Sequence, residues 1–177
     1  ELDQIFAISV GGFSIMDNHL HVLLRIDEEQ AKSWSALEIA KRWTRLFPPR
    51  GADRNPMKVT DEFLQLRANN PTWVEETRKR LSSLGWMMKC LKEPLARLAN
   101  KQDECKGAFF EGRFKSIAIL DEESLLSVCA YIDLNPVAAG IVSLPEESPH
   151  TSIKERVDHA KATGRLKDVE EIRNGSV

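Results

Sequence analysis

The sequence has few of the residues that would indicate a disulfide-stapled, exported or membrane-spanning chain. Its three cysteines, Cys90, Cys105 and Cys129, are an odd number at wide and irregular spacing, which favours neither a disulfide framework nor a CxxC metal site. No apolar run approaches the roughly 20 residues that cross a bilayer, and no secretory leader opens the chain. We therefore expect a cytoplasmic protein in a reducing compartment, without a membrane partner.

An excess of positive charge is also missing. The 25 Lys and Arg residues against 27 Asp and Glu give a net charge of -2, which argues against a general polyanion binder. Basic residues do gather in residues 41–58, where six of them stand against Asp53 alone. This stretch predicts a local nucleic-acid contact through Arg42 and Arg45, and a solvated helix face explains it equally well.

Length and patterning predict one domain over residues 1–156, followed by a polar tail or surface helix over 157–177. The first six residues have the apolar spacing of the last turns of a helix, so we expect an N-terminally trimmed fragment. Residues 27–106 are predicted to be mostly helical, with prolines between helical segments at 35–47, 60–69 and 71–101. Three tryptophans of this part are candidates for stacking on unpaired bases, with packing as the alternative: Trp43, Trp73 and Trp86.

A pair of histidines lies in a predicted strand over residues 13–26. Alternate positions of this strand are apolar and are expected to face the core: Leu20, Val22, Leu24 and Ile26. His19 and His21 then share the other face, about 7 Å apart for a rise of roughly 3.3 Å per residue. Asp17 and Asn18 suit a bend or bulge just before them.

A second predicted strand, residues 113–119, precedes the helix that carries the only tyrosine. Arg113 and Lys115 on this strand are candidate contacts to a DNA backbone, with solvation of a strand edge as the alternative. Asp121 is a predicted helix N-cap. The helix is expected to end at about residue 135, because the residue before Pro136 is pushed out of the helical region.

Tyr131 and Asn135 are four residues apart on this helix, so their side chains leave from one edge. If the helix crosses the sheet face that carries His19 and His21, two imidazole nitrogens and one amide oxygen surround a divalent cation. Such ligation with open positions suits Mg²⁺ or Mn²⁺ acting on a phosphate better than a closed zinc site. The Tyr131 hydroxyl is then the candidate nucleophile. Paired structural histidines and a packed tyrosine are the alternatives.

Three longer sequence motifs resemble those of a known family: residues 16–24 (MDNHLHVLL), 112–116 (GRFKS) and 131–142 (YIDLNPVAAGIV). The sequences of residues 86–97 and 109–114 also resemble that family. They resemble the REP-associated tyrosine transposases, a group of the single-tyrosine HUH transposases, over residues 6–156. The resemblance implies that His19, His21 and Asn135 are metal ligands and that Tyr131 is the nucleophile. Ala138 departs from the family, which has an arginine at that position.

The resemblance also implies an α+β fold with a ferredoxin-like antiparallel sheet, into which residues 27–106 are inserted as helices. The implied function is a DNA transposase that cleaves and rejoins single-stranded DNA near hairpins through a 5′-phosphotyrosine, as a monomer or homodimer. One alternative is a domesticated protein that binds DNA hairpins without transposing. Another is a nucleotidyl hydrolase of the HxHxH kind. Leu23 argues against it, because it occupies the position of the third histidine.

Overall fold

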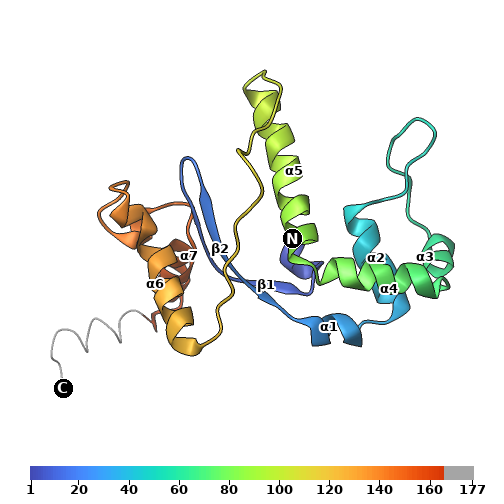
Figure 1. The fold of residues 1–177 in the computed structure, drawn as a ribbon, viewed down its shortest axis with the longest axis horizontal. Helices are drawn as coiled ribbons and strands as arrows, with labels where there is room; N and C mark the ends of the chain where they lie inside the picture. Colours follow the sequence, from blue (N-terminus) through green and yellow to red (C-terminus); the bar gives the residue numbers. More distant parts are fainter. Residues whose placement is uncertain (166–177) are drawn as a thin grey trace. The chain divides into compact units, whose positions relative to one another are not determined.

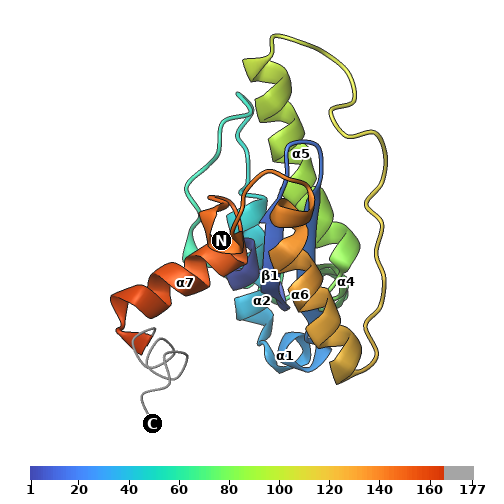
Figure 2. The ribbon, with the colours of Figure 1, turned by 90° about the vertical axis from the view of Figure 1, so that its left-hand side faces the viewer.

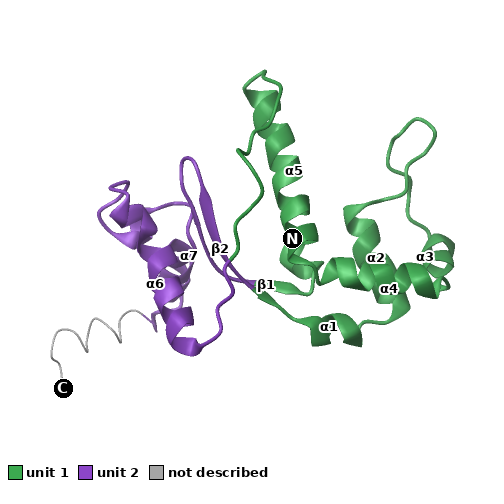
Figure 3. Ribbon diagram, viewed as in Figure 1, with its two compact units in different colours: residues 1–9, 25–116 green, residues 10–24, 117–177 purple. Residues whose placement is uncertain are grey.

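The computed structural model describes residues 1–165. The fold is α+β, as predicted, and its elements follow the chain in the order η1 (Leu2–Gln4), β1 (Ile8–Ile15), β2 (Leu20–Ile26), α1 (Glu28–Ser33), α2 (Ala36–Leu46), α3 (Asp61–Ala68), α4 (Pro71–Leu81), α5 (Leu84–Gln102), α6 (Glu122–Ala138), η2 (Pro145–Glu147) and α7 (Ser152–Ala162) (Figure 1). The chain divides into two compact units. The first contains residues 1–9 and 25–116, and the second contains residues 10–24 and 117–177 (Figure 3). None of the helices described is long and apolar enough to cross a membrane.

The predicted strand over residues 13–26 is confirmed at residues 20–26, but it is not continuous, because residues 16–19 are the turn of an antiparallel hairpin of β1 and β2. Asp17 and Asn18 are the tip of its turn, and the N–H of Met16 donates to the carbonyl of His19 at 2.8 Å. The predicted core face is wrong: Leu20, Val22 and Leu24 are half-buried and Ile26 is exposed. A two-stranded ribbon has too little cover to bury a full face, and alternation alone does not reveal this.

The predicted strand over residues 113–119 is wrong as well. Residues 113–120 have no regular secondary structure, and the side chains of Ile117 and Leu120 are 92% and 90% exposed. A strand needs a neighbour to satisfy its backbone N–H and C=O groups. The described sheet contains only β1 and β2, so this segment has no partner within residues 1–165.

The first unit consists mainly of helices, and two of them begin at a capping side chain. Ser35 caps α2 and Thr60 caps α3, each accepting a hydrogen bond from the N–H three residues ahead. The predicted segments at 35–47 and 60–69 are confirmed, whereas the segment at 71–101 is broken between α4 and α5 at residues 82–83. Apolar side chains from several elements form the core of this unit, including Phe6, Ile8, Ile39 and Leu81.

In the second unit, α6 begins as predicted and ends later than predicted. The carboxylate of Asp121 accepts the backbone N–H of Ser124 at 2.7 Å, which confirms the N-cap. The expected stop at Pro136 is wrong, because α6 continues to Ala138. Proline removes a single N–H donor, and the helix pattern resumes at once, since the N–H of Ala139 donates to the carbonyl of Asn135 at 2.9 Å. Burial of the Pro136 ring favours this continuation.

The start of α7 is bound to β1. Thr151 forms an antiparallel bridge with Ser14, and the Ser152 hydroxyl accepts the N–H of Phe13 at 3.0 Å while it donates to the carbonyl of Phe13 at 3.2 Å. These contacts place α7 at one edge of the hairpin. Of the predicted tail over 157–177, residues 157–162 belong to α7, and residues 166–177 lie outside the described part of the chain.

Candidate active site at the hairpin turn and helix α6

The structure brings the two histidines together at the tip of the hairpin. His19 is the last residue of the turn and His21 is the second residue of β2. Their ring centroids are 5.0 Å apart and the rings are nearly perpendicular, at 84°. The turn therefore lets the imidazoles approach more closely than the predicted spacing along an extended strand.

Helix α6 lies beside the hairpin and brings Tyr131 to the histidines (Figure 2). The Tyr131 ring is 5.2 Å from the His21 ring, edge to face at 78°, and its side chain is 56% exposed. An exposed ring leaves the hydroxyl accessible to a ligand. Asn135 follows one helical turn later and is half-buried, so it leaves from the same edge of α6.

Three features hold this part of α6 in place. Ile132 is 4% exposed and Pro136 is fully buried, which together give the helix a packed side next to its polar edge. Asp133 accepts a hydrogen bond from the guanidinium of Arg156 on α7. Because Tyr131 comes directly before Ile132 and Asp133, its backbone is well fixed although its side chain is exposed.

The two imidazoles differ in their hydrogen bonding. Nδ1–H of His19 donates to the amide oxygen of Asn18 at 2.6 Å, because an amide oxygen can only accept. In the neutral ring this bond leaves the lone pair of His19 on Nε2. Nε2 of His21 is buried and has no hydrogen-bond partner within the described residues. Burial first, and then the charge of His19, lower the pKa of His21, so its neutral form is favoured.

These features fit a divalent metal ion. A neutral imidazole with a buried, unpaired nitrogen lacks the partner that such a group normally has, and a metal ion would supply it. Asn18 fixes the ring of His19 in the way that outer hydrogen bonds usually orient metal-binding histidines. Residues 1–165 contain no group of three His, Cys, Asp or Glu that could hold a metal ion. A third protein ligand would therefore be an amide oxygen, and Asn135 is the candidate.

The four residues predicted to contact DNA all belong to the first unit, and they differ in exposure and in hydrogen bonding. Arg45, Arg113 and Lys115 are exposed, and Arg113 lines an open groove with Lys89 and Lys92 of α5. The Arg42 guanidinium instead donates to the carbonyls of residues 4 and 5, which gives it a structural role, and its predicted contact with DNA stays a prediction.

Asn18 is the site residue that the sequence interpretation missed. The sequence indicated only a turn-forming role for Asn18, so its hydrogen bond with the His19 ring was not predicted. An amide directly before a histidine in the motif is the signal that indicates such a contact.

Comparison of the chain with protein-family models, with curated proteins and with solved structures finds no match. Function is therefore inferred from the geometry around His19, His21 and Tyr131, together with the motif resemblance.

Proposed function

We propose that this protein is a DNA strand transferase of the single-tyrosine HUH type, which cleaves and rejoins single-stranded DNA near hairpins. The observation that carries the proposal is the contact between Tyr131 and His21. An exposed phenol lies edge to face with an imidazole whose Nε2 is buried and unpaired within the described residues, and His19 also contacts that imidazole edge to face. A nucleophile next to a pair of nitrogen ligands is suited to phosphoryl transfer.

In the proposed reaction Tyr131 attacks a phosphodiester. Its oxygen loses a proton to solvent and forms a bond to phosphorus, while the bond from phosphorus to the 3′ oxygen breaks. The leaving oxygen takes a proton and becomes a free 3′-hydroxyl, and the 5′ side stays on the protein as a phosphotyrosine. Attack by a 3′-hydroxyl reverses these steps, so a strand is rejoined without ATP.

His19 and His21 would hold Mg²⁺ or Mn²⁺ through Nε2, and Asn135 would hold it through its amide oxygen. When bound, such an ion acts as a Lewis acid that offsets the charge developing on the phosphate. By holding the ion these three residues would fix where the phosphate binds, and the anchored α6 positions Tyr131 for in-line attack.

The ferredoxin-like sheet implied by the resemblance is part of this proposal. A ferredoxin-like sheet requires further strands next to the β1–β2 hairpin. Residues 113–119 are the candidate for one of them, since they have strand-like alternation and exposed apolar side chains. We expect this segment to pair once a neighbouring strand is present.

A second candidate function is binding of DNA hairpins without cleavage. Ala138 favours it, since this exposed position on α6 has no positive charge where the family has an arginine. Such a protein would keep the fold and its DNA contacts and would form no covalent product.

A denaturing gel separates the two functions. The protein is incubated with labelled hairpin-bearing single-stranded DNA and Mn²⁺, beside the Tyr131→Phe variant and a sample with chelator. Since Tyr131 is the only tyrosine, a shifted band that needs both metal and Tyr131 identifies the phosphotyrosine. Retained hairpin binding with no shifted band in the wild type would favour the binding protein.

A further inference from the structure

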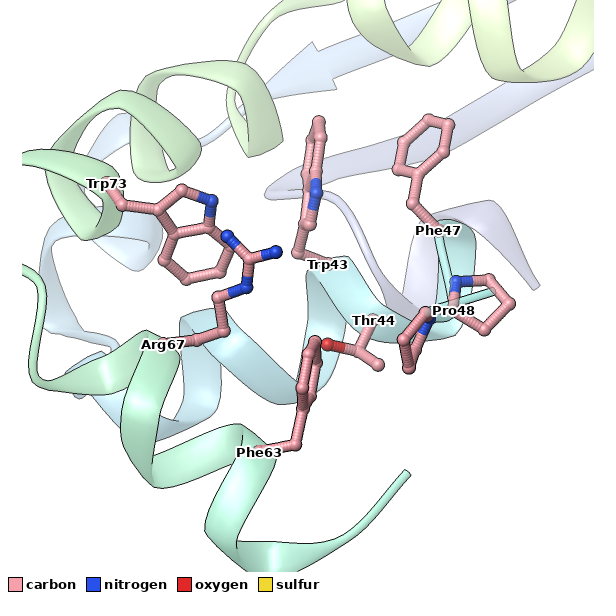
Figure 4. A pocket seen from close by; sticks show the side chains of 8 residues that line it. Trp43, Thr44, Phe47, Pro48, Phe63, Arg67 and Trp73 are labelled. Atoms are coloured by element: carbon pink, nitrogen blue, oxygen red, sulfur yellow. The ribbon is translucent and has the colours of Figure 1, made fainter. Parts of the chain in front are cut away.

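A second concave site lies within the helical first unit. Residues of α2, α3 and α4, together with the loop after α2, enclose a cavity of about 230 Å³. Half of the eight residues that line it are aromatic: Trp43, Phe47, Phe63 and Trp73. Arg67 is the only charged residue among those that line it, and Figure 4 shows its guanidinium between the rings of Trp73 and Trp43.

The aromatic side chains form a continuous cluster that stays accessible. The Trp43 ring is 4.7 Å from Phe47 and 5.3 Å from Trp86, measured between ring centroids. Trp43, Trp73 and Trp86 are all half-buried, so none of them lies fully in the core. Rings that are neither in the core nor fully in water offer flat faces to a planar ligand.

Three cations lie over the faces of these rings. Arg67 is 5.4 Å from the Phe63 centroid and 5.3 Å from that of Trp73. Arg80 lies over Trp43 and Trp86, and Lys89 lies over Trp86. Arg80 has a carboxylate partner, Glu76 at 3.4 Å. Within residues 1–165 no carboxylate lies within ion-pair distance of Arg67.

We propose that this pocket binds one unpaired base of single-stranded DNA. Aromatic walls with a guanidinium provide stacking surfaces for a base, and the unpaired charge of Arg67 complements the adjoining phosphate. The basic residues of the 41–58 stretch continue the positive charge along the chain next to Trp43. An uncharged ligand would use the rings and leave Arg67 without a counterion. The choice of single-stranded DNA as the nucleic acid rests on the proposed function.

Photo-crosslinking tests the pocket directly. An oligothymidine with 5-iododeoxyuridine in place of some thymines is irradiated with the wild-type chain, and the crosslinked peptide is mapped by mass spectrometry. We expect the crosslink at Trp43, Phe63 or Trp73. A crosslink confined to other peptides would overturn the proposal, and so would the absence of any crosslink with a folded protein.

Affinity for the same oligonucleotide provides a second readout. Trp73→Leu keeps apolar volume and removes the stacking face, so roughly tenfold weaker binding is expected from the loss of one stacked base. Arg67→Met should weaken binding to a similar extent, and Arg67→Lys less. Arg97→Met is the matched control, because Arg97 is an exposed arginine of the same unit outside the pocket. Circular dichroism verifies that each variant is folded. Wild-type affinity in both Trp73→Leu and Arg67→Met would contradict the proposal.

The pocket and the proposed strand transfer can fail separately. A pocket crosslink without a Tyr131 adduct would keep the base site and reject the transferase. An adduct without a pocket crosslink would do the reverse.

Discussion

Replacement of Arg42 distinguishes a structural arginine from a DNA contact. Its Nη1 donates to the carbonyl of Gln4 at 2.5 Å and to that of Ile5 at 3.2 Å. Its Nε lies 2.6 Å from a carboxylate oxygen of Glu38, without the alignment of a hydrogen bond, and the guanidinium is 3.9 Å from the centre of the Trp34 ring. Arg42 therefore joins the N-terminal segment to α2.

Arg42→Met keeps most of the aliphatic stem and removes all four contacts. A hydrogen bond from a charged donor contributes about 1.5–3 kcal/mol, an i,i+4 ion pair about 0.3–0.5 kcal/mol and a cation–π contact about 0.5–1 kcal/mol. These contributions are not additive, and the side chain is 21% exposed, so we expect a loss of about 3 kcal/mol in the free energy of unfolding. For a chain of this size that is roughly 6–12 °C in Tm.

Urea and thermal unfolding followed by circular dichroism measure this loss. Arg45→Met is the matched control on the same helix, and as an exposed substitution it should change stability by less than about 0.5 kcal/mol. Below its transition, Arg42→Met should bind single-stranded DNA as the wild type does. Unchanged stability together with weaker DNA binding would refute the structural role of Arg42.

The remaining predictions concern the metal site and the start of α6. Mn²⁺ should raise the Tm of the wild type, by the equivalent of about 2.7 kcal/mol at a hundredfold excess over Kd, and His21→Ala should abolish this shift while the control His159→Ala retains it; an equal shift in all three proteins would place the metal elsewhere. Hydrogen bonds from the backbone and then the hydroxyl of Ser124 hold the pKa of Asp121 below its ordinary value of 3.8. Because the pKa is lowered in the folded state, the ionised Asp121 stabilises the fold at pH values above its unfolded-state pKa, and this stabilisation is lost as the pH falls through its folded-state pKa. Acid below about pH 4 should therefore weaken α6 in the wild type but less in Asp121→Asn. Identical acid titrations of the two proteins, followed by helical circular dichroism, would contradict this.

The sequence by itself determined the local features of this protein. Ser35, Thr60 and Asp121 mark helix starts because a side-chain oxygen satisfies N–H groups only a few residues away. The placing of Tyr131 and Asn135 on one edge of α6 follows from helix periodicity in the same way. Each of these features depends on residues that are close along the chain, so the pattern is sufficient to predict it.

Only the tertiary structure decided features that depend on distant partners. Residues 113–119 have strand-like alternation, yet a strand exists only where another strand accepts its hydrogen bonds. Helix α6 passes Pro136 because the ring is buried, and Arg42 turns inward because two carbonyls near the N-terminus need donors. The approach of Tyr131 to His21 and the aromatic pocket around Arg67 likewise join separate elements. Packing between residues far apart in the chain selects such contacts, and sequence periodicity carries no record of them.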